Sequence, residues 1–185
     1  AAGRIRELTD ASDARLVLYT YDSAGRLTRE DNGNLTFTTY AFDDAGQLTR
    51  LVNHLPDGTV SSRFDYTYDA LGRRTSVTTL EGLTTFGYDA IGQLTLVVLP
   101  DSRIIQYEYD AVGNRTAVID NGVTTNYKSN TLNQYLRIGS FDRTYDKDGN
   151  LITDEAGGPG GTTYTYDDES RLLSWVDGVL SVGYE

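Results

Sequence analysis

The residues best suited to chemistry in this sequence are carboxylates that stand close together. They occur as Asp43-Asp44, as Asp146 with Asp148, and as Asp167-Asp168-Glu169. A glycosidase needs two such groups at a set separation, and one of them needs a raised pKa. These carboxylates, however, recur at the same position of a repeated motif, which is typical of residues that form turns. The sequence therefore predicts turn formers here and no catalytic residues.

Metal and cofactor chemistry has equally little support. The segment Asp146-Lys147-Asp148-Gly149-Asn150 looks like the start of a calcium loop, but the later ligands, including a terminal Glu, are not in place. The only histidine, His54, stands beside a turn with no cysteine or second histidine as a partner. We expect a surface histidine, no metal site and no cofactor.

Charge and composition exclude several classes of partner. The chain has 185 residues and a formal net charge of −11, which disfavours nucleic acid and docking to anionic lipid. No apolar stretch approaches the roughly 18 residues of a membrane helix, so membrane insertion is not expected. The chain has no cysteine and no methionine, and its first residues are not a signal peptide. The missing initiator methionine predicts a fragment or a processed product.

Aromatic and turn-forming residues point to the elements that must position these groups. The sequence holds 14 Tyr, 5 Phe and 19 Gly but only 3 Pro, which favours an all-β protein with many turns. No window shows a sustained helical period. Residues 8–18 are the one weak helical candidate, and we expect them to form strand, turn and strand.

A motif of about 21 residues repeats along the whole chain. Each copy has an aromatic residue, an Asp and, in all but the last, a Gly three positions further on. These residues are Tyr21, Asp22, Gly25; Phe42, Asp43, Gly46; Tyr68, Asp69, Gly72; Tyr88, Asp89, Gly92; Tyr109, Asp110, Gly113; Tyr145, Asp146, Gly149; and Tyr166, Asp167. A degenerate copy is expected at Tyr127, with Asn133-Gln134 in place of the Gly-polar pair. Residues 1–185 are thus predicted to be a single array of about eight repeats, which Tyr184-Glu185 would extend into a truncated ninth.

Each copy predicts two strands joined by a turn. Aromatic doublets at i and i+2 place both rings on one face of a strand. The doublets are Tyr19/Tyr21, Tyr40/Phe42, Tyr66/Tyr68, Phe86/Tyr88, Tyr107/Tyr109 and Tyr164/Tyr166. Asp-x-x-Gly then favours a type I turn followed by a left-handed Gly. We expect the rings to stack from repeat to repeat as a ladder on the buried face, while an alternative is that they stack on sugars.

A second turn is predicted between copies. The candidates are Asp31-Asn32-Gly33-Asn34, Pro56-Asp57-Gly58, Glu81-Gly82, Pro100-Asp101-Ser102, Asp120-Asn121-Gly122 and Asp177-Gly178. Two strands per repeat give about 16 short antiparallel strands in one meander, and such a strip should be curved. The glycine-rich segment 157–161 is expected to be a flexible loop between strands.

The repeated Tyr-Asp-x-x-Gly-polar-Leu-Thr pattern resembles the YD repeat of the RHS proteins, which include toxins, toxin-complex subunits, wall-associated proteins and teneurins. The resemblance covers essentially the whole chain. It implies a β-sheet strip that spirals into a shell, around a toxic domain in the toxins and for adhesion in teneurins. The plug segment linked to self-cleavage in many members is not found here, so no cleavage residues are assigned. With fewer repeats than a full shell uses, an open strip is expected.

The sequence therefore predicts a non-catalytic structural scaffold, secreted or at the cell surface, as a fragment of such a shell or of a surface stalk. Its expected partners are the remainder of a parent RHS chain, an enclosed toxin domain, or another copy paired through open sheet edges. The alternative is an adhesin that binds carbohydrate or protein. Such a module would use the irregular places, namely Trp175 and the loops 53–57 and 155–161.

Overall fold

A computed structural model of the chain describes residues 3–157, 161–178 and 180–183. These residues form eighteen β-strands and one short 3-10 helix, which confirms the predicted all-β class. The chain divides into two compact units, Ala1–Arg103 and Ile104–Glu185. Each unit holds four copies of the repeat. That the two units form a single array remains a prediction.

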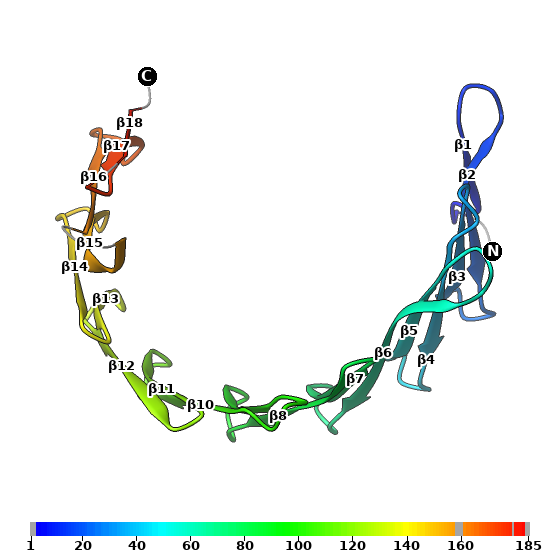
Figure 1. Ribbon diagram of the computed structural model, residues 1–185, viewed down its shortest axis with the longest axis horizontal. Helices are drawn as coiled ribbons and strands as arrows, with labels where there is room; N and C mark the ends of the chain where they lie inside the picture. The colour runs from blue at the N-terminus through cyan, green and yellow to red at the C-terminus, as the bar shows by residue number, and fades with distance from the viewer. Residues whose placement is uncertain (1–2, 158–160, 179, 184–185) are drawn as a thin grey trace. The chain divides into compact units, whose positions relative to one another are not determined.

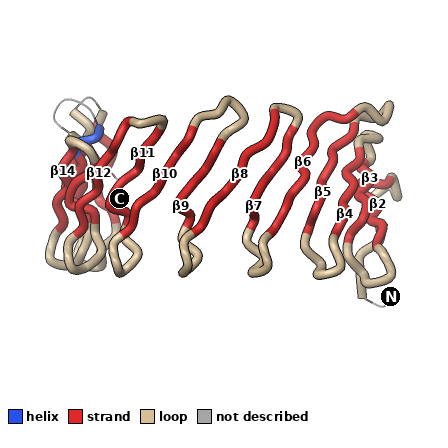
Figure 2. Tube along the Cα trace, turned by 90° about the horizontal axis from the view of Figure 1, so that it is seen from below, coloured by secondary structure: helices blue, strands red, loops and turns tan. Residues whose placement is uncertain are grey.

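The first unit is an antiparallel meander in which each strand pairs with the next one along the chain. Figure 1 labels strands β1 to β8 from the blue end of the chain onward, and Figure 2 labels β9. They are β1 (Glu7–Thr9), β2 (Arg15–Tyr21), β3 (Leu27–Asn32), β4 (Phe37–Phe42), β5 (Leu48–His54), β6 (Val60–Tyr68), β7 (Arg74–Thr79), β8 (Gly82–Tyr88) and β9 (Leu94–Val98).

The second unit repeats this pattern, again with sequential antiparallel pairs. Its strands are β10 (Ile104–Tyr109), β11 (Arg115–Asp120), β12 (Val123–Ser129), β13 (Tyr135–Ile138), β14 (Phe141–Tyr145), β15 (Leu151–Asp154), β16 (Thr162–Tyr166), β17 (Leu172–Val176) and β18 (Ser181–Gly183). The 3-10 helix η1 (Glu155–Gly157) follows β15.

Two kinds of turn lie at opposite ends of the strands, because consecutive strands run in opposite directions. In Figure 2 the turn between β8 and β9 lies at one end of the strands, and the turn between β7 and β8 lies at the other. We call the first kind YD turns, and the end of the strands where they lie is the YD margin. The YD turns are residues 22–26, 43–47, 69–73 and 89–93 in the first unit, and 110–114, 130–134, 146–150 and 167–171 in the second.

Most predictions about the elements are confirmed. The eight copies supply the sixteen strands β2–β17, and β1 and β18 are two further strands. Residues 8–18 form strand, turn and strand as predicted. Tyr184-Glu185, the expected start of a ninth copy, lies outside the described residues, as does most of the expected loop 157–161.

A β-bulge accompanies every YD turn, at a position that holds Thr in five copies and Leu or Ile in the other three. In the third copy Thr67 pairs with Ser76, whereas the next residue, Tyr68, pairs with Arg74, so Thr75 is left unpaired. The same shift leaves Thr28, Thr49, Thr95 and Thr116 unpaired in other copies. A bulge bends its strand and increases its local twist. The repeat therefore carries its own local bend, which the sequence pattern did not predict.

Each unit is a single layer of sheet, so little of it is enclosed. Among the described residues only Val52, Val97 and Ala117 are buried apolar side chains. The doublet rings are half-buried. In a repeat protein of this kind, stability comes mainly from contacts between neighbouring repeats.

The Asn32-Gly33 turn differs from its prediction. Asn-Gly normally marks a two-residue hairpin turn in which both residues have positive φ. Here the turn is longer: Leu35 N–H donates to the Asn32 carbonyl (2.9 Å), and the left-handed residue is Leu35, with φ of 69°. By contrast, Asn121 and Gly122 both have positive φ, as a type I′ turn requires.

Replacing Leu35 by glycine should stabilise the protein. Leu35 is 72% exposed, so little burial is lost, and glycine removes the strain that a side chain meets at positive φ. We expect Leu35→Gly to raise the free energy of unfolding by about 0.5–1 kcal/mol in urea denaturation. The control is Leu55→Gly, at an exposed turn position outside the set of positive-φ residues. Equal loss of stability in both variants would contradict the prediction.

Candidate functional site

The Asp of the motif organises its turn with both carboxylate oxygens. In the third copy, Asp69 Oδ1 accepts hydrogen bonds from the backbone N–H groups of Leu71 (2.9 Å) and Arg73 (3.0 Å). The Gly72 N–H donates to the Asp69 carbonyl (3.0 Å), and Gly72 has φ of 77°. This is the type I turn with a left-handed glycine that the sequence predicted. The Asp side chains therefore accept hydrogen bonds within their own turns, as expected for residues that form turns.

The polar residue after the glycine is a second member of the site that sequence reasoning missed. Its side chain donates to Oδ2 of the same Asp. The pairs are Asp22–Arg26, Asp43–Gln47, Asp69–Arg73, Asp89–Gln93, Asp110–Asn114, Asp146–Asn150 and Asp167–Arg171. A signal was present in the sequence, because this position always holds Arg, Gln or Asn, each of which has a terminal N–H donor.

These hydrogen bonds favour the ionised form of Asp22, Asp110 and Asp146. The side-chain amide of Asn114 lowers the pKa of Asp110, helped by backbone N–H groups of the turn and opposed by partial desolvation. The pKa of Asp146 is lowered in the same way by Asn150. For Asp22 the largest cause of the lowered pKa is the backbone N–H of Arg26. A pKa lowered by folding means that the charged Asp stabilises the folded state.

Asp110→Asn should distinguish the contribution that Asp110 makes to stability through turn geometry from the contribution of its charge. Asn130 occupies the equivalent position in the next copy, and its Oδ1 accepts the same two backbone hydrogen bonds, from Leu132 (2.9 Å) and Gln134 (3.0 Å). We therefore expect Asp110→Asn to lower the melting temperature less than Asp110→Ala, which removes all of these bonds.

The pH dependence of the same variants follows from the direction of the shift. Because the folded pKa of Asp110 is lowered, its contribution is present above the unfolded pKa of about 3.9 and is lost as pH falls through the folded value. Wild type should thus lose stability below pH 4 more steeply than Asp110→Asn. Thermal melts at pH 7 and pH 3 measure this, and parallel losses in the two proteins would refute it.

The same polar side chain also reaches the next YD turn. Arg26 Nη1 donates to the Asp43 carbonyl (2.8 Å), and Arg73 Nη1 donates to the Asp89 carbonyl (3.2 Å). In the second unit, Gln134 Nε2 donates to the Gly149 carbonyl (3.1 Å). Each link connects one YD turn to the next within a unit.

The tyrosine hydroxyl links consecutive copies at the bulge. Tyr68 Oη donates to the Leu48 carbonyl (2.7 Å), and Tyr88 Oη donates to the Arg74 carbonyl (2.8 Å). Tyr145 makes the equivalent bond to the Tyr135 carbonyl (3.0 Å). In each case the accepting residue stands immediately before the unpaired bulge residue of the preceding copy. The hydroxyl thus bonds the backbone where the strand ladder is interrupted.

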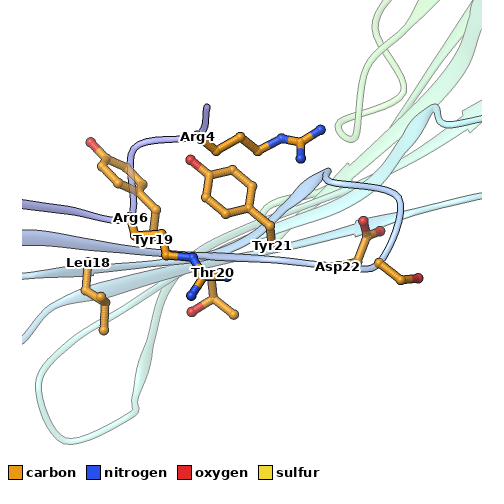
Figure 3. Close-up of a pocket in the computed structure, with 8 residues that line it drawn as sticks. Arg4, Arg6, Leu18, Tyr19, Thr20, Tyr21 and Asp22 are labelled. Carbon is orange, nitrogen blue, oxygen red and sulfur yellow. The ribbon is translucent and has the colours of Figure 1, made fainter. Parts of the chain in front are cut away.

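In the first copy, Tyr21 makes the equivalent hydrogen bond to the segment before β1, which includes Gly3, Arg4 and Ile5. Gly3 has φ of 95°, and Tyr21 Oη donates to the Ile5 carbonyl (2.8 Å). The Arg4 guanidinium lies 5.8 Å from the centroid of the Tyr21 ring. Figure 3 shows Arg4 beside Tyr21, with Thr20 on the opposite face of the strand. The hollow at this place is lined by Arg4 and Tyr21 of this link, together with Arg6, Leu18, Tyr19, Thr20, Asp22 and Ser23.

The predicted ladder of stacked rings is wrong. Among the described residues, rings meet in the pairs Phe37–His54, Phe64–Tyr66 and Tyr127–Tyr135, and no pair joins the leading aromatics of consecutive copies. One strand lies between the strands that carry these leading aromatics, so they are two strand spacings or about 9.6 Å apart, whereas rings that interact have centroids about 4.5–7 Å apart. Guanidinium groups lie over several rings instead, such as Arg26 over Phe42 (5.2 Å) and Arg73 over Tyr88 (4.8 Å).

The degenerate copy has Asn133-Gln134 in place of the Gly-polar pair, as predicted, but its leading residue is not the predicted Tyr127. Its turn is Asn130 to Gln134, with Asn133 in the left-handed conformation. Ser129, and not Tyr127, therefore holds the leading position, and it pairs with Tyr135 just as Tyr109 pairs with Arg115. Tyr127 is the first member of a doublet whose second ring is missing. The aromatic ring was the misleading signal, because the turn and not the ring defines the register.

The other candidate residues also have structural partners. His54 is half-buried and stacks on Phe37 with centroids 4.3 Å apart, so it is less exposed than a surface residue. Asp146 holds the 146–150 turn, and Asp148 donates its N–H to Asp146 Oδ1 (3.0 Å). Trp175 in β17 is half-buried and lies opposite Tyr164 in the neighbouring strand β16.

Neither a metal-binding cluster nor a membrane-spanning helix is found among the described residues. No group of three or more His, Cys, Asp or Glu residues there could hold a metal ion. No helix in the same residues has the length and apolar character that a membrane crossing requires.

The fold and turns define a class of protein: a single-layer β-repeat whose polar residues are used to join one repeat to the next. The sequence profile of the RHS repeat matches residues 1–36, 42–85 and 88–124, which is more than half of the chain. The chain therefore belongs to the RHS repeat family. No curated protein sequence matches it significantly.

Solved structures of toxin-complex chains share the fold. The structure of TcdB2-TccC3-Cdc42 aligns with a TM-score of 0.61 at 18% identity, over 92% of this chain and 12% of that one. TcdB2-TccC3 gives a TM-score of 0.59 at 19% identity, over 91% and 12%. The Tc holotoxin pore of Photorhabdus luminescens gives 0.59 at 18% identity, over 88% and 11%. The chain thus spans about an eighth of these longer chains.

Proposed function

We propose that this chain is a non-catalytic scaffold, part of an RHS-repeat shell that encloses a toxin polypeptide outside the cell that makes it. The observation that carries the proposal is the use of both carboxylate oxygens of each motif Asp. Asp22 and Asp69, for example, accept hydrogen bonds from their own turns with both oxygens. A general acid or base needs an oxygen free to exchange a proton with substrate. Similarity to the Tc holotoxin pore supports the toxin context.

Protease protection in the natural polypeptide that carries this sequence tests the enclosure. We expect a segment of that polypeptide to resist digestion while the repeats are intact. A variant carrying Asp69→Ala, Asp89→Ala and Asp110→Ala weakens three YD turns and should expose the same segment. Digestion that is equally fast in both proteins would contradict enclosure. The role as a scaffold would survive that result if the wild-type repeats remained folded by circular dichroism.

An adhesin at the cell surface that binds carbohydrate or protein is the alternative function. Carbohydrate binding needs exposed ring faces, but the doublet rings are half-buried and several lie beneath a guanidinium. This arrangement favours the scaffold. A glycan array probed with the chain decides between the two, because reproducible binding that is lost on Tyr40→Ala would support the adhesin.

A further inference from the structure

The chain contains two Asn-Gly dipeptides in the same local sequence. They are Asn32-Gly33 and Asn121-Gly122, and each follows an aspartate, Asp31 in one case and Asp120 in the other. Each dipeptide lies at a turn between two copies of the repeat. In Asn-Gly the backbone nitrogen of the glycine can attack the carbonyl carbon of the Asn side chain, because glycine has no side chain to hinder the approach. With the same residue before them, the two sites differ mainly in how the fold constrains them.

The fold holds the nitrogen of Gly33 in place. Its N–H donates to the Leu16 carbonyl (2.8 Å). Asn32 is half-buried, and its Nδ2 donates to Thr36 Oγ1 (3.1 Å). A methyl group on Gly33 would lie 2.5 Å from the carbonyl oxygen of Arg15, so this turn lies directly against the backbone of β2. The Gly33 nitrogen can therefore reach the Asn32 side chain only after the turn has left β2 and these hydrogen bonds have broken.

The fold leaves the corresponding groups of Asn121 and Gly122 accessible. Both residues are exposed, and beyond its chain neighbours no atom lies within 4 Å of a methyl group on Gly122. Among the described residues, the backbone hydrogen bonds of the turns include a donor at Gly33 but none at Gly122. The Asn121 N–H donates to the Ile104 carbonyl (2.8 Å), which does not engage the nitrogen that reacts. An exposed hairpin tip of this kind opens locally at a small cost in free energy.

We propose that Asn121 is the site at which the folded chain undergoes deamidation, and that the fold protects Asn32 from the same reaction. The Gly122 nitrogen forms a bond to the side-chain carbonyl carbon of Asn121. Its proton passes to the side-chain nitrogen, which leaves as ammonia. The cyclic imide then takes up one water and opens at one of its two carbonyl–nitrogen bonds, which gives aspartate or isoaspartate. This proposal does not depend on enclosure of a toxin.

The two products affect the hairpin differently. Asn121 and Gly122 both have positive φ, and they join the last pair of β11 and β12, Asp120 opposite Val123. Aspartate suits the first position of such a turn as asparagine does. Isoaspartate adds a carbon atom to the backbone, so two residues no longer join the strands in the same register. Deamidation at this site therefore weakens the β11–β12 hairpin, whereas an Asn121→Asp variant keeps its fold.

Peptide mapping by mass spectrometry, after incubation of the folded chain at mildly alkaline pH, tests the assignment. We expect deamidation at Asn121 to be at least about tenfold faster than at Asn32, because one hydrogen bond that must first be broken can slow a reaction by that factor. In denaturing urea the two Asp-Asn-Gly sequences should react at similar rates. Equal rates in the folded chain, a faster reaction at Asn32, or a tenfold difference that persists in urea would overturn the proposal.

Release of ammonia from the folded chain checks the site independently. Asn121→Asp removes the reacting amide and should abolish most of the release. The matched control is Asn133→Asp, at an exposed asparagine that also has positive φ but is followed by Gln134. This control should release ammonia as fast as the wild type. Undiminished release from Asn121→Asp would place the reaction at another residue and refute the proposal.

Discussion

Gly33→Ala should be among the most destabilising single substitutions in the first unit. A methyl group at position 33 would lie 2.5 Å from the carbonyl oxygen of Arg15, which is too close for any real contact. That oxygen belongs to the backbone of β2 and cannot rotate away as a flexible side chain would. The Gly33 N–H also donates to the Leu16 carbonyl (2.8 Å), so moving the two segments apart breaks a hydrogen bond.

We expect Gly33→Ala to lower the free energy of unfolding by about 2–3 kcal/mol, as overpacking against rigid neighbours does. For a chain of this size that corresponds to a melting temperature roughly 5–9 °C lower. The matched control is Gly46→Ala, where φ is 83° but no atom lies within 4 Å of the new methyl group. That variant should lose only the conformational advantage of glycine, about 1 kcal/mol. The expectation fails if Gly46→Ala is the more damaging of the two.

Gly33 illustrates how sequence reasoning can find the right residue for the wrong reason. The dipeptide Asn32-Gly33 predicts a turn from local sequence alone, and such a turn needs glycine because φ is positive at that position. The structure places positive φ at Leu35 and uses Gly33 for close approach to β2. That approach depends on a strand more than ten residues earlier, so no local pattern could predict it.

The strands and YD turns were predictable because their signals are local. Ring doublets with period two mark one face of a strand, and Asp-x-x-Gly with the polar residue that follows it contains the groups that its turn uses. The links between copies were not predictable in the same way. Tyr68 was assigned to the correct strand, but its hydroxyl bond to Leu48 spans twenty residues of sequence. Likewise, the spacing of strands in a sheet, and not the presence of the rings, rules out a stacked ladder.

Excising one complete repeat should leave the fold intact. Deletion of residues 69–88 joins Tyr68 directly to Asp89 and recreates a complete motif, Tyr-Asp-Ala-Ile-Gly-Gln-Leu-Thr. Strands β6 and β8 both end in the leading tyrosine of a doublet and run in the same direction, so β6 can replace β8 as the partner of β9. The Tyr68 bond to Leu48 is retained as well. We expect a cooperative thermal transition only a few degrees lower, because stability in such arrays sums over neighbouring repeats.

Removing half a repeat should have a much larger effect. Deletion of residues 69–78 joins Tyr68 to Thr79 and removes one turn together with most of β7. The strand that follows must then run opposite to its normal direction, which moves the 89–93 turn to the other end of the strands. The deletion also removes Arg74, whose carbonyl accepts the hydrogen bond of Tyr88. We expect loss of the cooperative transition and of much of the β-sheet signal in circular dichroism. If the ten-residue deletion were tolerated as well as the twenty-residue one, the two-strand repeat would not be the unit of folding. The links between copies would then contribute little to stability.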